Sequence, residues 1–310
     1  MQNDVQNDSQ YDDEIDLREL FGVLWAGKVK IIAITAMFAV ASVIYALSVP
    51  NQYKATALLA PAQSDGGGLS GALGQLGGLA SLAGVSLGGG ESGEAQIAQE
   101  IMKSWSYIEG FIADNNIAVE VYAAEGWNKG SNTLEINNDA YDVGTSKWLL
   151  EDESGAIGPP SSWQLFESFS QILSVSEDKK SGLVSVSIEY YSPQIAKQWV
   201  DMYIESINRF MQQRQIDKVT RNINYLQEQI EKTAIAEMQE VFYTIIEEQT
   251  KNKMLAEASP DYVFVAVGPS MVPELKSQPK RALICILGTL LGGMLSVLLV
   301  LIMHYAKKSD

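Results

Sequence analysis

The chain has 310 residues, a formal net charge of −16, one cysteine and one histidine. Cys285 and His304 lie in or beside an apolar segment, so the large central part of the chain cannot build a disulfide framework, a zinc site or a histidine acid–base pair. The acidic balance disfavours nucleic acid as a partner, because a negative surface repels phosphate. We therefore expect no catalytic, metal-binding or cofactor-binding residues, and expect the many carboxylates to form a solvated face.

Two stretches of the chain are apolar enough to cross a membrane. Residues 31–49 and 282–303 carry no charge, and each is close to the roughly 20 residues that a helix needs to span hydrocarbon. The first stretch could instead be a cleaved signal peptide, since Ala46, Leu47 and Ser48 resemble a cleavage site. However, signal peptides have short basic leads, and residues 1–30 are rich in acid. A retained transmembrane helix is therefore favoured.

The orientation of the chain follows from basic residues near the first span. Lys28 and Lys30 precede this span and only Lys54 follows it, which predicts a cytoplasmic N-terminal tail, residues 1–30. Two spans return the C-terminal tail, residues 304–310, to the same side. The intervening domain then lies beyond the membrane; it holds 30 acidic and 17 basic side chains, and thus most of the net charge.

A glycine-rich segment, residues 66–93, follows the first strand and contains twelve of the 25 glycines. Gly66, Gly68 and Gly71 match the dinucleotide-binding pattern, and Glu91 follows at a suitable distance. That motif needs a helix to begin at the loop, and the leucines and glycines that follow are poor helix formers. A chance match is favoured. The segment is either an apolar loop that lies against the membrane or a neighbouring subunit, or a surface insertion without a role.

The domain from residue 50 to residue 281 has an α/β pattern. Helices are expected where apolar residues recur every three or four positions, over Glu94–Asn115, with Ile97, Ile101, Trp105, Ile108 and Ile112 on one face, and over Ser162–Leu173, with Trp163, Phe166 and Phe169 on one face. The expected strands are Tyr53–Leu59, Leu173–Ser176, Leu183–Tyr191 and Tyr262–Val267. The middle two form a hairpin around Asp178–Gly182, and residues 117–160 give no clear order of elements.

A long helical region occupies residues 193–259, because Pro193 suits a first helical turn and neither glycine nor proline follows until Pro260. Its apolar seam has the spacing of a coiled coil and comprises Ile216, Val219, Ile223, Leu226 and Ile230, extended by Ala234, Met238, Val241 and Ile245. The strands on either side should share one sheet, so the chain is expected to turn back near Glu231–Glu237. The seam packs within one chain or also lines a subunit interface; the sequence leaves both open.

Prolines and glycines mark the approach to the second span. Pro269, Pro273 and Pro279 predict a stiff, extended connector over residues 269–279, since each proline fixes its backbone and prevents helix formation. Within the second span, Gly288 and Gly292 form a G-x-x-x-G pattern that allows close helix packing.

Several segments, taken in order, resemble the Wzz-type polysaccharide co-polymerases, the O-antigen chain-length determinants of the bacterial inner membrane. They are Asp16-Leu17-Arg18-Glu19-Leu20 with Trp25, Gln52-Tyr53-Lys54-Ala55, the run from Leu173 through Gly182 to Pro193 and Ala196, and the stretch containing Pro269, Pro273, Pro279, Lys280 and Arg281. The resemblance runs from about Ile15 to the end of the chain. It is weakest across residues 62–93 and 117–160.

This resemblance implies an α+β membrane protein with two transmembrane helices, a periplasmic α/β base and a long protruding helical hairpin. It implies a non-catalytic regulator of polysaccharide chain length in lipopolysaccharide O-antigen biosynthesis. The implied partners are further copies of the chain, the O-antigen polymerase, its lipid-linked polysaccharide and the membrane. Capsule-export relatives often carry a cytoplasmic kinase after the second span, and we expect none here.

Other functions remain open beside this one. A structural scaffold or adaptor for capsule or exopolysaccharide export is the closest alternative, because long helical hairpins suit that role too. A two-span sensor is disfavoured by its short cytoplasmic tails, and an extracytoplasmic glycan enzyme by the lack of a recognisable catalytic group.

Overall fold

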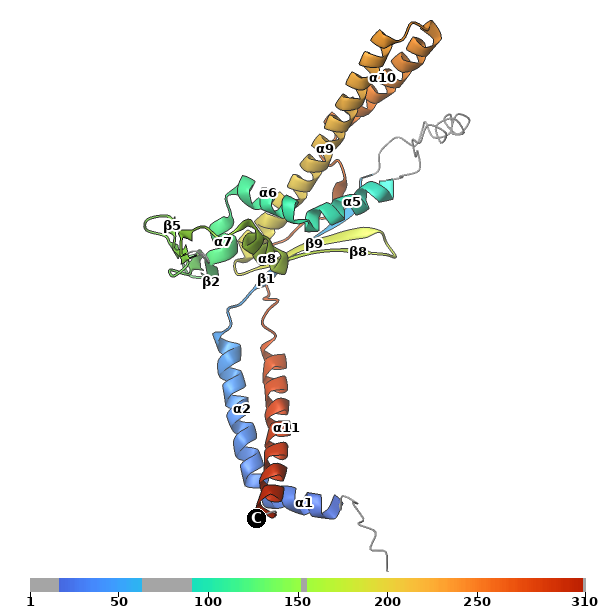
Figure 1. Ribbon diagram of the computed structural model, residues 1–310. Coiled ribbons are helices and arrows are strands. Elements are labelled where there is room, and N and C mark those ends of the chain that lie inside the picture. Colours follow the sequence, from blue (N-terminus) through green and yellow to red (C-terminus); the bar gives the residue numbers. More distant parts are fainter. Residues whose placement is uncertain (1–16, 63–90, 152–154, 309–310) are drawn as a thin grey trace, which may run out of the picture. The chain divides into compact units, whose positions relative to one another are not determined.

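The computed structural model describes residues 17–62, 91–151 and 155–308, and the chain divides into two compact units (Figure 1). One unit joins the two ends of the chain, Met1–Val49 and Gln278–Asp310, and the other comprises Pro50–Ser277. The two ends of the chain therefore belong together, although the whole second unit lies between them in sequence.

Over residues 17–49 and 278–308 the terminal unit has three helices. Helix α1 (Leu17–Ala26) precedes α2 (Lys28–Ser48), and α2 packs along α11 (Arg281–Lys308) (Figure 1). Both α2 and the Arg281–His304 part of α11 are long and apolar enough to cross a membrane. The 21 residues of α2 give it a length of about 31 Å. Most of the large apolar side chains of α2 and α11 are exposed, as suits helices surrounded by lipid, and the two helices coincide with the spans expected from the sequence.

The central unit is built on a four-stranded antiparallel sheet with the order β10-β1-β9-β8. Its strands are β1 (Tyr53–Pro61), β8 (Leu173–Asp178), β9 (Leu183–Tyr190) and β10 (Phe264–Gly268). Strand β1 lies between β9 and β10, and its side chains alternate between buried and exposed positions. The two strands that flank the long helical region in sequence therefore share one sheet, as expected.

The hairpin between β8 and β9 forms at the predicted turn. The Asp178 carboxylate accepts hydrogen bonds from the Lys180 amide at 2.9 Å and the Ser181 hydroxyl at 3.0 Å. These bonds, led by the one from the Lys180 amide, lower the pKa of Asp178. Gly182 completes the turn with a φ of +70°, a conformation that glycine adopts without steric cost.

Helices cover one face of the sheet and enclose an aromatic core. α5 (Glu91–Lys103), α6 (Trp105–Asn115), α8 (Ser162–Ile172) and the first turns of α9 surround this core. Its largest buried side chains include Tyr203, Phe169, Phe264, Leu59, Ile108 and Ile188. Tyr203 lies at the centre, because its ring packs against those of Tyr107, Phe111 and Phe169. The core thus joins the sheet to the base of the long helix.

The single helix expected over Glu94–Asn115 is wrong in one respect, because the chain breaks at Ser104. This residue has an extended backbone, with φ −74° and ψ 146°, and its hydroxyl donates a 2.7 Å hydrogen bond to the Ile101 carbonyl. Because of this break, the apolar residues expected on one face of a single helix do not all face the core. Ile97 and Trp105 are 48% and 46% exposed. Trp163 of α8, also expected to face inward, is 54% exposed and packs edge-on against Trp105.

Residues 117–160 have no clear order in the sequence; their described part, 117–151 and 155–160, contains one short helix and three pairs of short strands. Helix α7 (Ala118–Ala123) is followed by the pairs β2–β3, β4–β5 and β6–β7. The strands are β2 (Ala124–Asn128), β3 (Thr133–Ile136), β4 (Tyr141–Asp142), β5 (Lys147–Trp148), β6 (Leu150–Glu151) and β7 (Ile157–Gly158). Asn132 and Ser146 occupy turns with positive φ, which neither β-branched nor bulky residues would favour.

The long helical region forms α9 (Pro193–Lys232) and α10 (Ala236–Glu257), which pack side by side (Figure 1). The Ser192 side chain caps α9 by accepting a hydrogen bond from the Ile195 amide at 3.4 Å, and Pro193 occupies the first turn. Thr233 and Ile235, both extended, bound the break between the two helices. The chain therefore reverses inside the interval Glu231–Glu237.

Candidate functional site

The first candidate surface is the seam between α9 and α10. On α9, Val219 is 2% exposed and the other four expected seam residues are half-buried. Those four are Ile216, Ile223, Leu226 and Ile230. Steps of three and four residues hold them in one line along the helix, and α10 is the element packed along this part of α9. The α9 seam is therefore covered within one chain.

The expected extension of the seam into α10 is wrong. Met238, Val241 and Ile245 are 46%, 57% and 37% exposed, and Ala234 is exposed as well. The inward-facing positions of α10 are instead Gln239, Phe242, Ile246, Gln249, Lys253 and Ala256. The break at Thr233–Ile235 resets the helical phase, so Met238, Val241 and Ile245 each directly precede an inward-facing residue and lie about a quarter turn away from the inward face of α10. We call Met238, Val241 and Ile245 the outer stripe.

Two glutamine side chains close the ends of the helix pair. Gln239 Nε2 donates to the carbonyls of Ile230 at 3.2 Å and Thr233 at 2.8 Å, where α9 ends. At the other end, Gln212 Nε2 donates to the carbonyls of Ala256 at 2.8 Å and Ser259 at 3.0 Å, where α10 ends. Both amides satisfy carbonyls that a helix terminus leaves without partners. Neither glutamine stands out in the sequence by motif or spacing.

The connector prolines occupy different environments. Pro269 is exposed, Pro273 is half-buried and Pro279 is buried, and residues 269–279 contain no helix. Two serines attach the connector to the central unit. Ser270 donates to the Asp201 carboxylate of α9, and Ser277 bonds to Gln52, just before β1, and to Glu189 of β9.

The contacts of Ser277 fix the last residue of the central unit. Its hydroxyl donates to the Gln52 carbonyl at 3.0 Å and lies within hydrogen-bond distance of the Glu189 carboxylate. Its amide donates to the same Gln52 carbonyl at 2.8 Å. The chain therefore leaves the sheet beside the point at which it entered, at the start of β1.

Gly288 and Gly292 lie where α11 meets α2. A Cβ atom at Gly288 would come within 2.5 Å of Ser42 Cβ, and one at Gly292 would overlap Phe38. By contrast, a Cβ at Gly293 would meet only Thr35 Oγ1, at 4.0 Å. Close packing at this interface therefore depends on two of the three glycines. Thr35 Oγ1 and Ser296 Oγ, 3.3 Å apart, add a hydrogen bond between the two helices.

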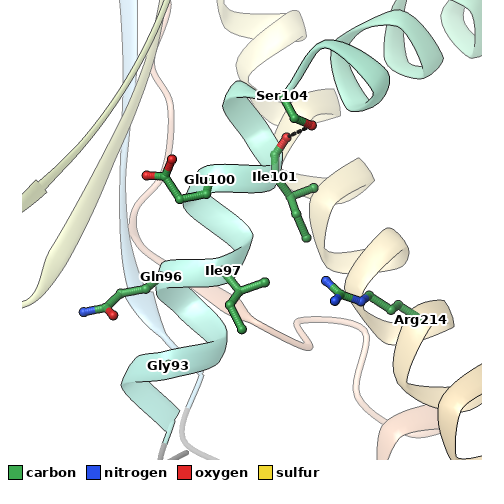
Figure 2. Close-up of a pocket in the computed structure, with 7 residues that line it drawn as sticks. All are labelled: Gly93, Gln96, Ile97, Glu100, Ile101, Ser104 and Arg214. Carbon is green, nitrogen blue, oxygen red and sulfur yellow. Dashed lines mark hydrogen bonds between the residues drawn. The ribbon is translucent and has the colours of Figure 1, made fainter.

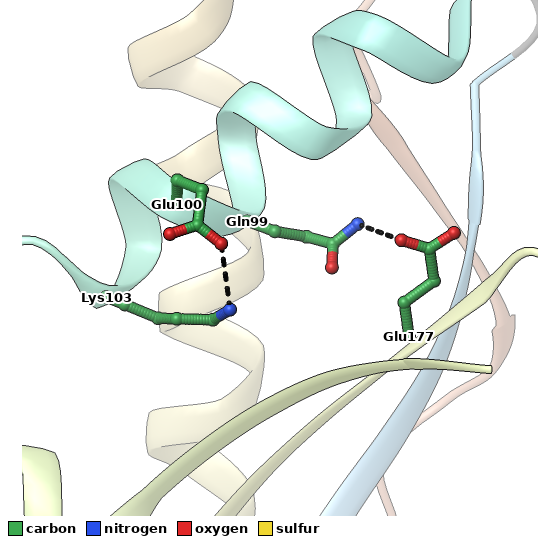
Figure 3. Close-up of polar contacts among 4 residues, drawn as sticks. All are labelled: Gln99, Glu100, Lys103 and Glu177. Atoms are coloured by element: carbon green, nitrogen blue, oxygen red, sulfur yellow. Dashed lines mark hydrogen bonds and ion pairs between the residues drawn. The ribbon is translucent and has the colours of Figure 1, made fainter. Parts of the chain in front are cut away.

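A hollow lies between α5 and α9. It is lined by Gly93, Gln96, Ile97, Glu100, Ile101, Ser104 and Arg214 (Figure 2). Its polar groups do not form a nucleophile–base arrangement. The Ser104 hydroxyl is engaged with the Ile101 carbonyl, and Glu100 forms an ion pair with Lys103 at 3.1 Å (Figure 3). On the other side of α5, buried Gln99 donates to the Glu177 carboxylate at 3.1 Å and links the helix to β8 (Figure 3).

Several tyrosines of the central unit have a raised pKa because they are buried. Burial raises the pKa of Tyr107, Tyr190 and Tyr203, whose hydroxyls lie in the core. Burial, followed by the nearby Glu94 carboxylate, raises the pKa of Tyr262 to about 12. Within residues 17–62, 91–151 and 155–308, no group of three or more histidine, cysteine, aspartate or glutamate side chains could hold a metal ion. Gly66, Gly68 and Gly71 of the glycine pattern lie outside the described residues.

A protein family described as "Chain length determinant protein", Wzz, matches residues 13–114. That segment runs from before α1 to the last turn of α6, and includes α2 and β1. No curated protein matches.

Two solved structures are similar to the chain. One, a full-length bacterial polysaccharide co-polymerase, is 15% identical with a TM-score of 0.40; the similarity covers 95% of this chain and 99% of that one. The other, a fragment of the polysaccharide co-polymerase WzzB from Salmonella Typhimurium, is 13% identical with a TM-score of 0.30, covering 74% and 100%. The family match confirms, over residues 13–114, the resemblance to Wzz-type chain-length determinants that the residues indicate.

Proposed function

We propose that this chain regulates the length of the O-antigen polysaccharide made for lipopolysaccharide, without catalysing a reaction itself. The observation that carries the proposal is the match of residues 13–114 to the chain length determinant family. In this proposal, α2 and α11 cross the bacterial inner membrane, both termini are cytoplasmic and residues 50–281 are periplasmic. The basic pair Lys28 and Lys30 supports this orientation, because lysines resist translocation.

The regulator is proposed to work as a homo-oligomer. The outer stripe supports this, since three large apolar side chains in register on α10 stay exposed in a single chain. Apolar area is costly to leave in water, at about 25 cal/mol per Å², so a stripe of this kind is a natural contact between copies. The α9–α10 pair is then the helical hairpin that projects from the α/β base.

The growing glycan and its polymerase are the remaining proposed partners. A polymer attached to a membrane lipid elongates beside the membrane, and a domain tethered there at both ends can contact it repeatedly. The Ser277–Gln52 bonds support this role for the connector, because they hold the two membrane-directed ends of the central unit together. Pro269, Pro273 and Pro279 would limit how far the second end can move.

Deletion of the gene in its host tests the proposal. Lipopolysaccharide resolved on a gel is expected to lose its modal band distribution, and the wild-type gene is expected to restore it. An unchanged distribution would contradict a role in O-antigen length. A defect confined to capsule or exopolysaccharide would instead favour the scaffold or adaptor function for export.

A further inference from the structure

Helix α1 carries an exposed aromatic pair that neither the seam nor the connector uses. Phe21 and Trp25 are 67% and 64% exposed, and their rings stack with centroids 6.4 Å apart. The Lys28 ammonium group lies 4.5 Å from the centre of the Trp25 ring. The three side chains thus form one exposed cluster of two aromatic rings and one positive charge, which we call the aromatic anchor.

The position of α1 is fixed by its packing against the membrane helices. α1 packs mainly on α11, and Val23, at 7% exposure, is its buried side chain among residues 21–26. Gly27 permits this approach, because a Cβ there would collide with Val300, itself 6% exposed. Phe21 and Trp25 lie two residues before and after Val23, so they project from the side of α1 that faces away from α11.

This geometry places the anchor at one end of the two spans, facing outward. α1 continues directly into α2 through Gly27, and it lies at the same end of the helix pair as the last turns of α11 (Figure 1). The ends of membrane-spanning helices lie at the level of the lipid headgroups. Tryptophan is enriched there because its ring is apolar and its indole N–H is polar. A lysine beside it can reach a phosphate while its methylene chain stays among apolar groups.

We propose that the aromatic anchor binds the interfacial layer of the bilayer, with Phe21 and Trp25 among the upper acyl chains and Lys28 beside a lipid phosphate. The inference rests on the proposed membrane location of α2 and α11. The continuity of α1 with α2 and its packing on α11 select lipid as the occupant, since this depth and outward direction are those of the surrounding bilayer. α1 would then hold the N-terminal end of α2 at a fixed depth and rotation.

Spin labels test this placement in the full-length chain. Cys285→Ser provides a background without cysteine, and nitroxides are attached at Phe21→Cys and Trp25→Cys after reconstitution into phosphatidylcholine vesicles containing anionic lipid. Gly22→Cys and Ala26→Cys are the matched controls, because both positions are exposed on a different side of the same helix. Collisions with oxygen report contact with the bilayer, and collisions with a soluble nickel chelate report contact with water.

The labels at positions 21 and 25 are expected to give a several-fold higher ratio of oxygen to nickel collisions than those at 22 and 26. Equal ratios, or strong nickel collision at 21 and 25, would show that the pair faces water. Immobilised labels protected from both reagents would show that protein covers the pair, and would also overturn the inference.

A second arm tests the lysine. Removing the anionic lipid should lower the protection of position 21, and Lys28→Gln should abolish this dependence on lipid charge. A dependence that survives Lys28→Gln would exclude Lys28 as the phosphate contact. These measurements do not involve polysaccharide. If the chain sets polymer length while position 21 faces water, the inference about the aromatic anchor fails and the proposed function stands.

Discussion

The side chain of Asn208 in α9 binds the backbone of Phe264 at the start of β10 through two hydrogen bonds. Asn208 Nδ2 donates to the Phe264 carbonyl at 2.8 Å, and Oδ1 accepts from the Phe264 amide at 2.9 Å. Oδ1 also accepts from the Val263 amide at 3.0 Å. Asn208 is 2% exposed and Phe264 is fully buried. One amide therefore attaches the returning strand to α9, although Asn208 and Phe264 are 56 residues apart in sequence.

Asn208→Ala is expected to lower the free energy of unfolding of the central unit by about 2–4 kcal/mol, because it leaves three buried backbone groups without partners. Denaturant unfolding followed by tryptophan fluorescence measures the loss. Asn224→Ala, at an exposed position on the same helix, is the control and should change stability by less than about 0.5 kcal/mol. Equal effects of the two substitutions would show that the Asn208 bonds contribute little.

Sequence patterns predicted the parts of the fold that have a strong local signal. The two spans, the strand Tyr53–Leu59 and the hairpin at Asp178–Gly182 follow from runs of apolar residues and from turn residues. The break at Ser104 was missed because the apolar spacing continues across it. The direction that α6 takes after this break depends on its packing against α8. The N-cap of α8, Ser161, is 57 residues beyond Ser104 in the chain.

The candidate site was predicted less completely, for a geometric reason. The five α9 seam positions follow from spacing alone, but the α10 half depends on how many residues the turn uses. Three residues without helical structure changed the phase, which moved Val241 outward and Phe242 inward. Asn208 could have been noticed, since it lies three residues before buried Met211 on an apolar face. Its partner, Phe264, is distant in sequence and could not.

The packing of α2 against α11 predicts a difference between two adjacent glycines. Gly292→Ala should separate the helices, because its Cβ would overlap Phe38, at a cost of about 1–3 kcal/mol. Gly293→Ala should be tolerated, because its Cβ meets nothing closer than 4.0 Å. The reporter is a disulfide between Thr35→Cys and Ser296→Cys in a Cys285→Ser background, since the native hydroxyls are 3.3 Å apart.

The rate of cross-linking under mild oxidation is expected to fall in Gly292→Ala and to match the parent in Gly293→Ala. Gly288→Ala should behave like Gly292→Ala, because its Cβ would meet Ser42. Similar rates in all three variants would argue against a close glycine contact between the helices.

The buried tyrosines predict a loss of stability at high pH. Burial raises the pKa of Tyr107, Tyr190 and Tyr203 in the folded chain, whereas in the unfolded chain each tyrosine ionises near its usual value of about 10. Their contribution is fully present below pH 10, about the unfolded pKa. Above it the unfolded state binds fewer protons than the folded state, so stability falls as pH rises. The expected slope is about 1.4 kcal/mol per pH unit for each tyrosine that stays protonated in the fold.

Absorbance at the wavelength of tyrosinate, combined with denaturant unfolding at several pH values, measures this effect. Tyr203→Phe should keep the core packing and reduce the slope above pH 10, although it loses the bond from the Tyr203 hydroxyl to the Met102 carbonyl. Tyr225→Phe, at an exposed tyrosine, is the control and should leave the slope unchanged. A slope that is equal in both variants would contradict the assignment to the core.

The outer stripe provides the last prediction, which tests the proposed assembly. Val241→Glu is expected to dissociate the oligomer, because it places a charge among apolar side chains that the proposed contact would bury. The fold of the single chain should remain, since Val241 is 57% exposed. Tyr243→Glu is the matched control. Tyr243 is 60% exposed, but it lies two residues after Val241 and therefore faces the opposite side of α10.

The mass of the detergent-solubilised particle, measured by light scattering, should fall in Val241→Glu and stay unchanged in Tyr243→Glu. Val219→Glu is expected to act differently, because this seam residue is 2% exposed within one chain, so the substitution should lower the melting temperature of the chain itself. If Val241→Glu kept the full particle mass, another surface would have to hold the copies together. If it lost mass and also shifted the gel distribution of polysaccharide lengths, assembly through α10 would be tied to length control.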